Sequence, residues 1–124
     1  MSELSEADDL PLGGQWVTFS RVGTTDVIRL AGEIDMANAG VIGREIAAQT
    51  VRARAVVIDL TAVSFLDSAG VRLLDTLVGA LAERQTPIRL VVAETGAVRM
   101  TLRLCAFRED LLDTDLTAAA TALG

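Results

Sequence analysis

Apolar and polar positions alternate in two short runs near the start of the chain. In the run 15–20, Val17 and Phe19 fall on one side, and Trp16 and Thr18 fall on the other. A second run at 26–31 follows a turn-forming sequence at 22–25 that contains Gly23. Because the connection is so short, the two runs are predicted to be strands of an antiparallel hairpin.

Beyond the hairpin, the pattern switches between helical stripes and short apolar runs. In the segment 68–84, Val71, Leu74, Val78 and Leu81 recur at helical spacing. The run 55–60 is apolar and β-branched, which is typical of a strand buried on both faces. The predicted helices are 36–50, 68–84, 96–107 and 116–123, the further strands 55–60, 88–93 and 111–114, and the loops 32–35 and 61–67.

This order predicts an α/β fold with helices packed against a mixed sheet. The sheet is expected to have four to five strands, to be mostly parallel, and to begin with the antiparallel hairpin. Residues 1–13 are polar and acidic and are predicted to be a flexible leader, so 14–124 form one domain. The leader lacks the features of a signal peptide, and no apolar run reaches the roughly 20 residues that span a bilayer. We therefore expect a cytoplasmic protein without a membrane partner.

Composition excludes most kinds of catalytic site. The chain has no histidine, tyrosine or lysine, so it cannot form a Ser-His-Asp triad or a Walker loop. Its one cysteine, Cys105, cannot supply a zinc site and is predicted to be a buried core thiol. The net charge is −6 and the arginines are scattered, which argues against direct binding of nucleic acid. No enzymatic activity, cofactor or metal is therefore predicted.

Two polar segments follow successive predicted parallel strands, at the sheet edge where function tends to gather. They are 32–35, which ends in Asp35, and 65–68, which ends in Asp67 and Ser68. We expect them to lie side by side. Spacing alone favours Ser68 as a helix N-cap, but a phosphoryl group at the same place would meet free N–H donors. Asp35 is likewise open to interpretation as an N-cap.

Two more residues nearby have structural interpretations. Asp59 could simply turn the chain where the strand 55–60 ends. Gly70 lies in the first turn of the helix 68–84, where glycine lowers helix propensity. Its expected use is to let another surface or backbone come close.

The segments 32–35 (GEID), 56–60 (VVIDL) and 65–71 (FLDSAGV) together resemble the STAS domain, named for sulphate transporters and anti-sigma factor antagonists. The segment 96–104 also fits, and the resemblance is strongest to free-standing bacterial anti-anti-sigma factors. It implies a protein that binds an anti-sigma factor with serine kinase activity and thereby frees a sigma factor. It also implies that the kinase phosphorylates Ser68 to end binding and that a serine phosphatase of the 2C type restores it.

By the same resemblance, the expected partner-binding residues surround this serine. They are Asp35, Asp67, Ser68, Ala69, Gly70 and Arg72. Asp67 is also expected to orient the serine, and Ala69 leaves Ser68 as the only hydroxyl of the motif. A weak homodimer is compatible with this prediction.

Two other hypotheses remain open on the sequence. The chain could be a STAS scaffold or accessory subunit of a stress-signalling or lipid-transport complex, in which Ser68 is only a helix cap. It could also bind a nucleotide or another small molecule, although no phosphate-binding loop supports this.

Overall fold

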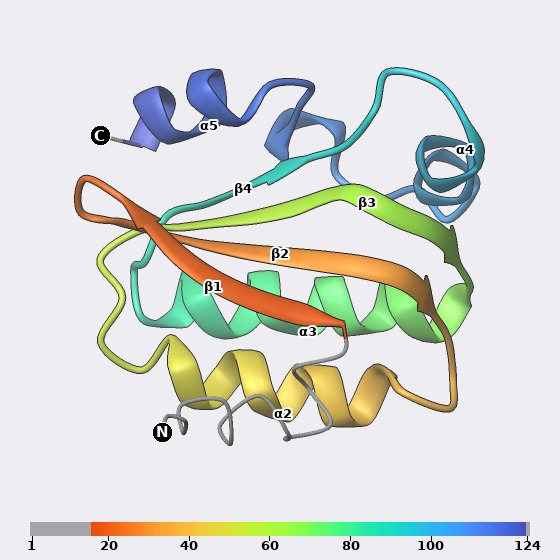
Figure 1. The fold of residues 1–124 in the computed structure, drawn as a ribbon, viewed down its shortest axis with the longest axis horizontal. Helices are drawn as coiled ribbons and strands as arrows, with labels where there is room; N and C mark the ends of the chain where they lie inside the picture. Colours follow the sequence, from red (N-terminus) through yellow and green to blue (C-terminus); the bar gives the residue numbers. More distant parts are fainter. Residues whose placement is uncertain (1–15, 124) are drawn as a thin grey trace, which may run out of the picture.

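A five-stranded sheet with helices on both faces makes up residues 16–123, the part of the chain that this computed structural model describes (Figure 1). The strands are β1 (Val17–Val22), β2 (Thr25–Ile34), β3 (Val56–Leu66), β4 (Ile88–Val91) and β5 (Leu112–Asp113). The helices are α2 (Ala39–Gln49), α3 (Ser68–Glu83), α4 (Ala97–Leu104), the 3-10 helix η2 (Glu109–Leu111) and α5 (Leu116–Leu123). The predicted leader at 1–13 lies outside the described residues.

The strands lie in sequence order across the sheet, from β1 at one edge to β5 at the other. β1 is antiparallel to β2, and the other neighbours are parallel. At the turn between β1 and β2, Gly23 has φ +62°, a conformation that costs glycine little. The mixed, mostly parallel sheet that begins with a hairpin is therefore confirmed.

The main hydrophobic core lies between the sheet and the helices α2 and α3, which share one face (Figure 1). Ile58 of β3 and Leu74 of α3 are among its fully buried residues. On the other face, α5 covers a smaller cluster formed by Val27, Val57, Val91 and Ala119. The helix α4 lies over the far end of β3 and adds Val98 and Leu102 to the main core. The start of β3 is thus buried on both sides, as its apolar sequence predicts. None of the helices within residues 16–123 is long and apolar enough to cross a membrane.

Both long strands continue through segments that we predicted to be loops. β2 runs to Ile34 and β3 runs to Leu66. The two strands stay paired, despite shifts in register, until these two residues lie opposite each other. The predicted loops at 32–35 and 61–67 are therefore wrong for most of their residues. Asp59 consequently lies inside β3, where Thr61 donates hydrogen bonds to its Oδ1 from the backbone (2.9 Å) and from the hydroxyl (2.7 Å).

The helix α4 ends earlier than predicted, and Cys105 is exposed instead of buried. Ala106 adopts φ +58°, while the N–H groups of Ala106 and Phe107 donate to Arg103 and Leu102. This is the Schellman pattern of helix termination, and it brings Phe107 back into the core. Cys105 occupies the C-cap, so the stripe formed by Val98 and Leu102 does not extend to it.

The exposed thiol gives a simple test of this helix end. We expect Cys105 in the native protein to react completely with an aromatic disulfide reagent, with no further thiol appearing after denaturation in urea. Cys105→Ser should abolish the signal and change the free energy of unfolding by less than about 0.5 kcal/mol, as for surface substitutions generally. Reaction only after unfolding would contradict the early helix end.

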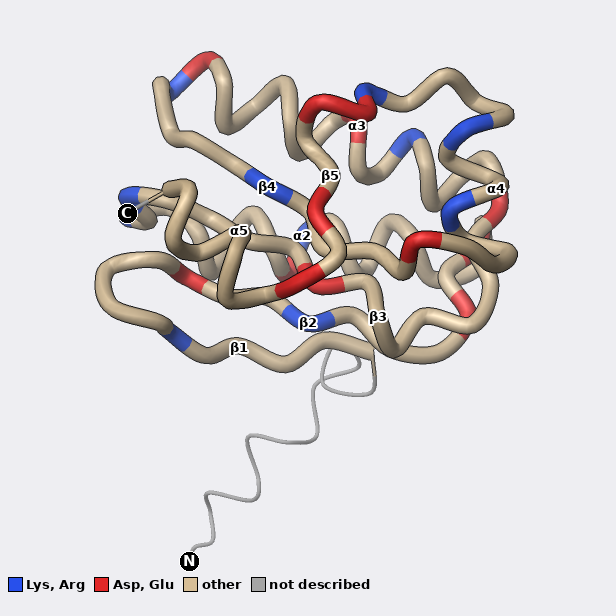
Figure 2. Tube along the Cα trace, turned by 90° about the horizontal axis from the view of Figure 1, so that it is seen from above, with Lys and Arg blue, Asp and Glu red and all other residues tan. Residues whose placement is uncertain are grey.

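An ion pair joins the short strand β5 to the sheet. Arg89 of β4 meets Asp113 of β5 through Nε–Oδ2 (2.6 Å) and Nη2–Oδ1 (3.1 Å) contacts. The hydrogen bond from Asp113 raises the pKa of Arg89 above its ordinary value. Elsewhere, Figure 2 shows the arginines spread along the described trace without gathering into a stripe. The two-point pairing thus holds a strand whose ladder with β4 is only two residues long.

Candidate functional site

The carboxylate of Asp67 joins the two segments that were expected to lie side by side. Its Oδ1 accepts a hydrogen bond from the N–H of Gly70 (3.0 Å), and its Oδ2 accepts one from the N–H of Met36 (3.3 Å). The backbone N–H of Asp67 also donates to the carbonyl of Ile34 (3.3 Å). The end of β2 and the start of α3 therefore meet at one site, as the parallel topology predicts.

Asp35 organises the turn that links β2 to α2. Its Oδ1 accepts from the N–H of Ala37 (2.9 Å), and its carbonyl accepts from the N–H groups of Asn38 (3.1 Å) and Ala39 (2.8 Å). Because this turn occupies residues 36–38, α2 begins at Ala39 and not at Met36. The interpretation of Asp35 as the N-cap of α2 is therefore wrong.

Asn38 stands at the N-cap of α2, and it is a site residue that the sequence analysis missed. Its side chain points back into the turn, where Oδ1 accepts from the N–H of Asp35 (2.9 Å) and Nδ2 donates to the carbonyl of Glu33 (2.8 Å). The side chain is buried. An asparagine three residues after an aspartate was the available signal, since both residue types form such local bonds.

Ser68 is the first residue of α3 and is exposed. The N-cap of α3 is Asp67, so the interpretation of Ser68 as the cap is wrong. Within residues 16–123, the Ser68 hydroxyl makes no hydrogen bond. The carboxylate of Asp67 is not hydrogen-bonded to it, because that carboxylate accepts from the backbone N–H groups of Met36 and Gly70. The hydroxyl is thus presented to solvent at a helix start.

Gly70 lies two residues after Ser68 in α3, is buried, and has no room for a side chain. A Cβ at this position would collide with the Cδ1 of Leu66 and would lie 3.2 Å from the carbonyl oxygen of Ile34. The expectation that Gly70 permits a close approach is borne out, and the groups that approach are the end of β3 and the backbone of β2.

The remaining predicted partner-binding residues lie on the same helix. Ala69 is half-buried and Arg72 is exposed, and both line a groove between α2 and α3. Met36, missed by the sequence analysis, lines its end and is 82% exposed. The available signal was its position, because Met36 does not belong to the apolar stripe formed by Ile42 and Ile46.

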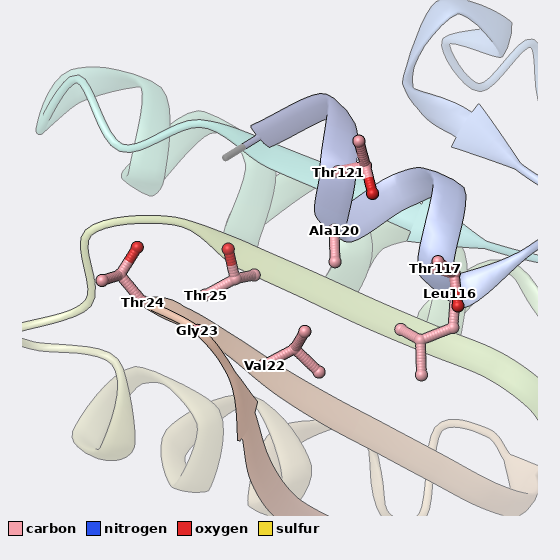
Figure 3. Close-up of a pocket in the computed structure, with 8 residues that line it drawn as sticks. All are labelled: Val22, Gly23, Thr24, Thr25, Leu116, Thr117, Ala120 and Thr121. Atoms are coloured by element: carbon pink, nitrogen blue, oxygen red, sulfur yellow. The ribbon is translucent and has the colours of Figure 1, made fainter.

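A second cavity of about 450 Å³ lies at the opposite end of the domain, between the β1–β2 turn and α5 (Figures 1 and 3). Threonines and small apolar residues line it, and none of the lining residues is charged. The start of α5 is part of the lining, but no cationic side chain is there to balance the phosphates of a nucleotide. Within residues 16–123, no three acidic or cysteine side chains are grouped so as to hold a metal ion.

Residues 19–120 match the STAS domain family, and the chain therefore belongs to that family. An anti-sigma factor antagonist from Mycobacterium paratuberculosis is similar in structure, with a TM-score of 0.79 at 29% identity over 86% of this chain and 92% of that chain. The anti-sigma factor antagonist SpoIIAA in its unphosphorylated form gives a TM-score of 0.70 at 21% identity over 85% and 92% of the two chains. Bacillus SpoIIAA in its phosphorylated form gives 0.65 at 20% identity over 87% and 99%. No curated protein sequence matches significantly.

Proposed function

We propose that this protein is a cytoplasmic anti-sigma factor antagonist that is switched by phosphorylation of Ser68. In its unmodified form it binds an anti-sigma factor that is also a serine kinase, and the sigma factor is released. Phosphorylation of Ser68 by that kinase ends the binding, and a serine phosphatase of the 2C type restores it. The observation that carries the proposal is the exposed hydroxyl of Ser68, which starts α3 beside the carboxylate of Asp67.

The surroundings of Ser68 explain how a phosphate would act. Phosphorylation adds about −1.5 to −2 charges at neutral pH. The added charge would stand next to Asp67, which is bonded to the turn that carries Asp35. A partner surface shaped for a neutral hydroxyl next to Asp67 would then meet bulk, like charge and a larger desolvation cost. The N–H groups at the start of α3 meanwhile favour an anion, so the modified protein stays folded.

The similarity to known proteins supports the same role. The structure from Mycobacterium paratuberculosis is described as an anti-sigma factor antagonist and covers most of both chains. SpoIIAA, which shares the fold, has been solved in an unphosphorylated and a phosphorylated form. Those descriptions support the antagonist role and a protein of this fold that exists in two phosphorylation states.

The modification itself can be mapped directly. After incubation with the cognate anti-sigma factor kinase and ATP, mass spectrometry is expected to find phosphate on Ser68, and Ser68→Ala is expected to accept none. Phosphate confined to other residues would refute the assignment of the switch. Incubation with the cognate phosphatase should then return the protein to its starting mass.

Binding should distinguish a neutral side chain from an anionic one at position 68. In calorimetric titrations with the anti-sigma factor, we expect Ser68→Ala to bind within about threefold of the native protein and Ser68→Glu to bind at least tenfold more weakly, a loss of about 1.4 kcal/mol. Ser20→Glu, which adds the same charge at an exposed serine of the edge strand β1, is the matched control and should bind normally. Equal affinities for the two Ser68 variants would contradict the charge argument.

A further inference from the structure

The helices α2 and α3 lie side by side on one face of the sheet and leave an open groove of about 510 Å³ between them. Gly40, Gly43 and Ala47 of α2 and Ala69 and Ala80 of α3 line it with small side chains. Gly43 lies close to the facing helix, since a Cβ there would lie 2.8 Å from the Cδ1 of Leu73, which would have to shift. Gly40 is less closely packed, because a Cβ there would meet only Nη1 of Arg44, at 3.5 Å. The guanidinium of Arg44 is therefore the one group that a side chain at position 40 would first touch.

Two arginines, one from each helix, line this apolar groove. They are Arg44 of α2 and Arg72 of α3, and both are exposed. Among residues 16–123, neither takes part in an ion pair, although five other ion pairs are formed. The chain as a whole carries a net charge of −6, whereas the residues that line this groove include two arginines and no carboxylate. The surface is complementary to an apolar segment that is flanked by carboxylates.

The groove also restricts the backbone of its occupant. An extended strand needs backbone partners, and the walls of this groove are helices whose backbone groups are already bonded within each helix. A helix satisfies its own backbone and can lay an apolar face into such a groove. Small residues on the walls let it approach closely.

We propose that the groove between α2 and α3 binds an amphipathic helix of the anti-sigma partner, with apolar side chains over Gly40 and acidic side chains on Arg44 and Arg72. The inference rests on the proposed function for the identity of that partner. It adds a second contact area to the surface around Ser68. The two areas are continuous, because Met36 and Ala69 line one end of the groove and Ala69 follows Ser68 directly.

This continuity connects the groove to the switch. Arg72 lies four residues after Ser68 in α3, a spacing at which side chains of opposite charge pair on a helix surface. A phosphate on Ser68 attracts Arg72 away from the acidic side chains of the bound helix and places negative charge at the end of the groove. Phosphorylation thus weakens both contact areas together.

Filling the groove tests the proposal without disturbing Ser68. Gly40→Leu adds a side chain to the groove lining where a Cβ meets only the guanidinium of Arg44, and leucine is the better helix former. Gly79→Leu is the matched control, because Gly79 lies in α3 outside the groove lining and a Cβ there meets no atom within 4 Å. In titrations with the purified anti-sigma factor, we expect Gly40→Leu to weaken binding at least tenfold and Gly79→Leu to change it less than threefold. Charge reversal in Arg44→Glu and Arg72→Glu should also weaken binding at least tenfold, and more at low salt than at high salt.

The outcomes separate this inference from the proposed function. If Ser68→Glu weakens binding while Gly40→Leu binds like the native protein, the groove is not a contact area and the inference is overturned, while the switch remains. If the native protein does not bind the anti-sigma factor at all, the proposed function fails and the inference fails with it. If Gly40→Leu abolishes self-association in sedimentation experiments but leaves anti-sigma binding intact, the occupant is a second copy, which also overturns the inference.

Discussion

Gly70→Val is expected to lower the free energy of unfolding by about 3 kcal/mol, at the upper end of the usual cost of overpacking a core. Helix propensity alone predicts no such loss, since most residues favour a helix interior over glycine by up to about 1 kcal/mol. Sterics decide the sign, because even a Cβ collides with the buried side chain of Leu66 and lies 3.2 Å from the carbonyl of Ile34. That carbonyl belongs to the strand backbone and cannot move aside cheaply.

Urea denaturation of two glycine variants in the same helix measures this effect. Gly79 is also in α3, but a Cβ there would meet no atom within 4 Å. Gly79→Val should therefore change stability by less than about 1 kcal/mol, and Gly79→Ala should raise it by a similar amount. If the valine variants at positions 70 and 79 unfold at the same urea concentration, Gly70 is not packed closely against Leu66 and Ile34.

Asp67→Ala is expected to cost about 2 kcal/mol of stability, more than the typical loss of about 1 kcal/mol for a helix N-cap. The reason is that its carboxylate accepts two backbone hydrogen bonds, one within α3 from Gly70 and one across to Met36. We also expect weaker binding to the anti-sigma factor, because the turn that presents Asp35 and Met36 loses its attachment to α3.

Another aspartate at a helix start serves to separate the contribution of the cap bond to Gly70 from that of the bond to Met36. Asp115 precedes α5, and within residues 16–123 its carboxylate accepts one hydrogen bond, from the N–H of Ala118 (3.1 Å), so Asp115→Ala should cost about 1 kcal/mol, as for a simple cap. Hydrogen exchange then locates the difference. The amide of Met36 should exchange faster in Asp67→Ala and at its native rate in Asp115→Ala. Unchanged exchange of Met36 in both variants would show that the bond across the two segments contributes nothing.

The order of helices and strands was predictable because each element carries its own period. The apolar stripe of α3 and the buried run at the start of β3 both appear in the structure as expected. The ends of elements were less predictable, because partners outside each segment set them. β3 continues past Leu60 only because β2 pairs with it, and α4 ends at Leu104 because Ala106 adopts a positive φ that alanine does not signal in a sequence.

The candidate site also has features that the sequence predicts and features that it does not. Parallel topology was enough to place Asp35 and Asp67 at one edge, and the hydrogen bond between Asp67 and Met36 confirms that the two segments meet. Sequence could not decide which polar residue caps which helix, since aspartate, serine and asparagine all suit the role. Asp67 and Asn38 hold those positions, not Ser68 and Asp35. The groove between α2 and α3 was also beyond prediction, because it depends on how two helix surfaces pack.

The bond between Met36 and Asp67 has a consequence for how partners are told apart. The donor in this bond is the backbone N–H of Met36. The side chain of Met36 plays no part in the bond and is 82% exposed. Every amino acid except proline supplies that N–H. Position 36 can therefore change its side chain while the turn and its bond to Asp67 keep their geometry. Under the proposed function, a change confined to this one exposed side chain would let two related proteins with the same serine switch bind different anti-sigma factors.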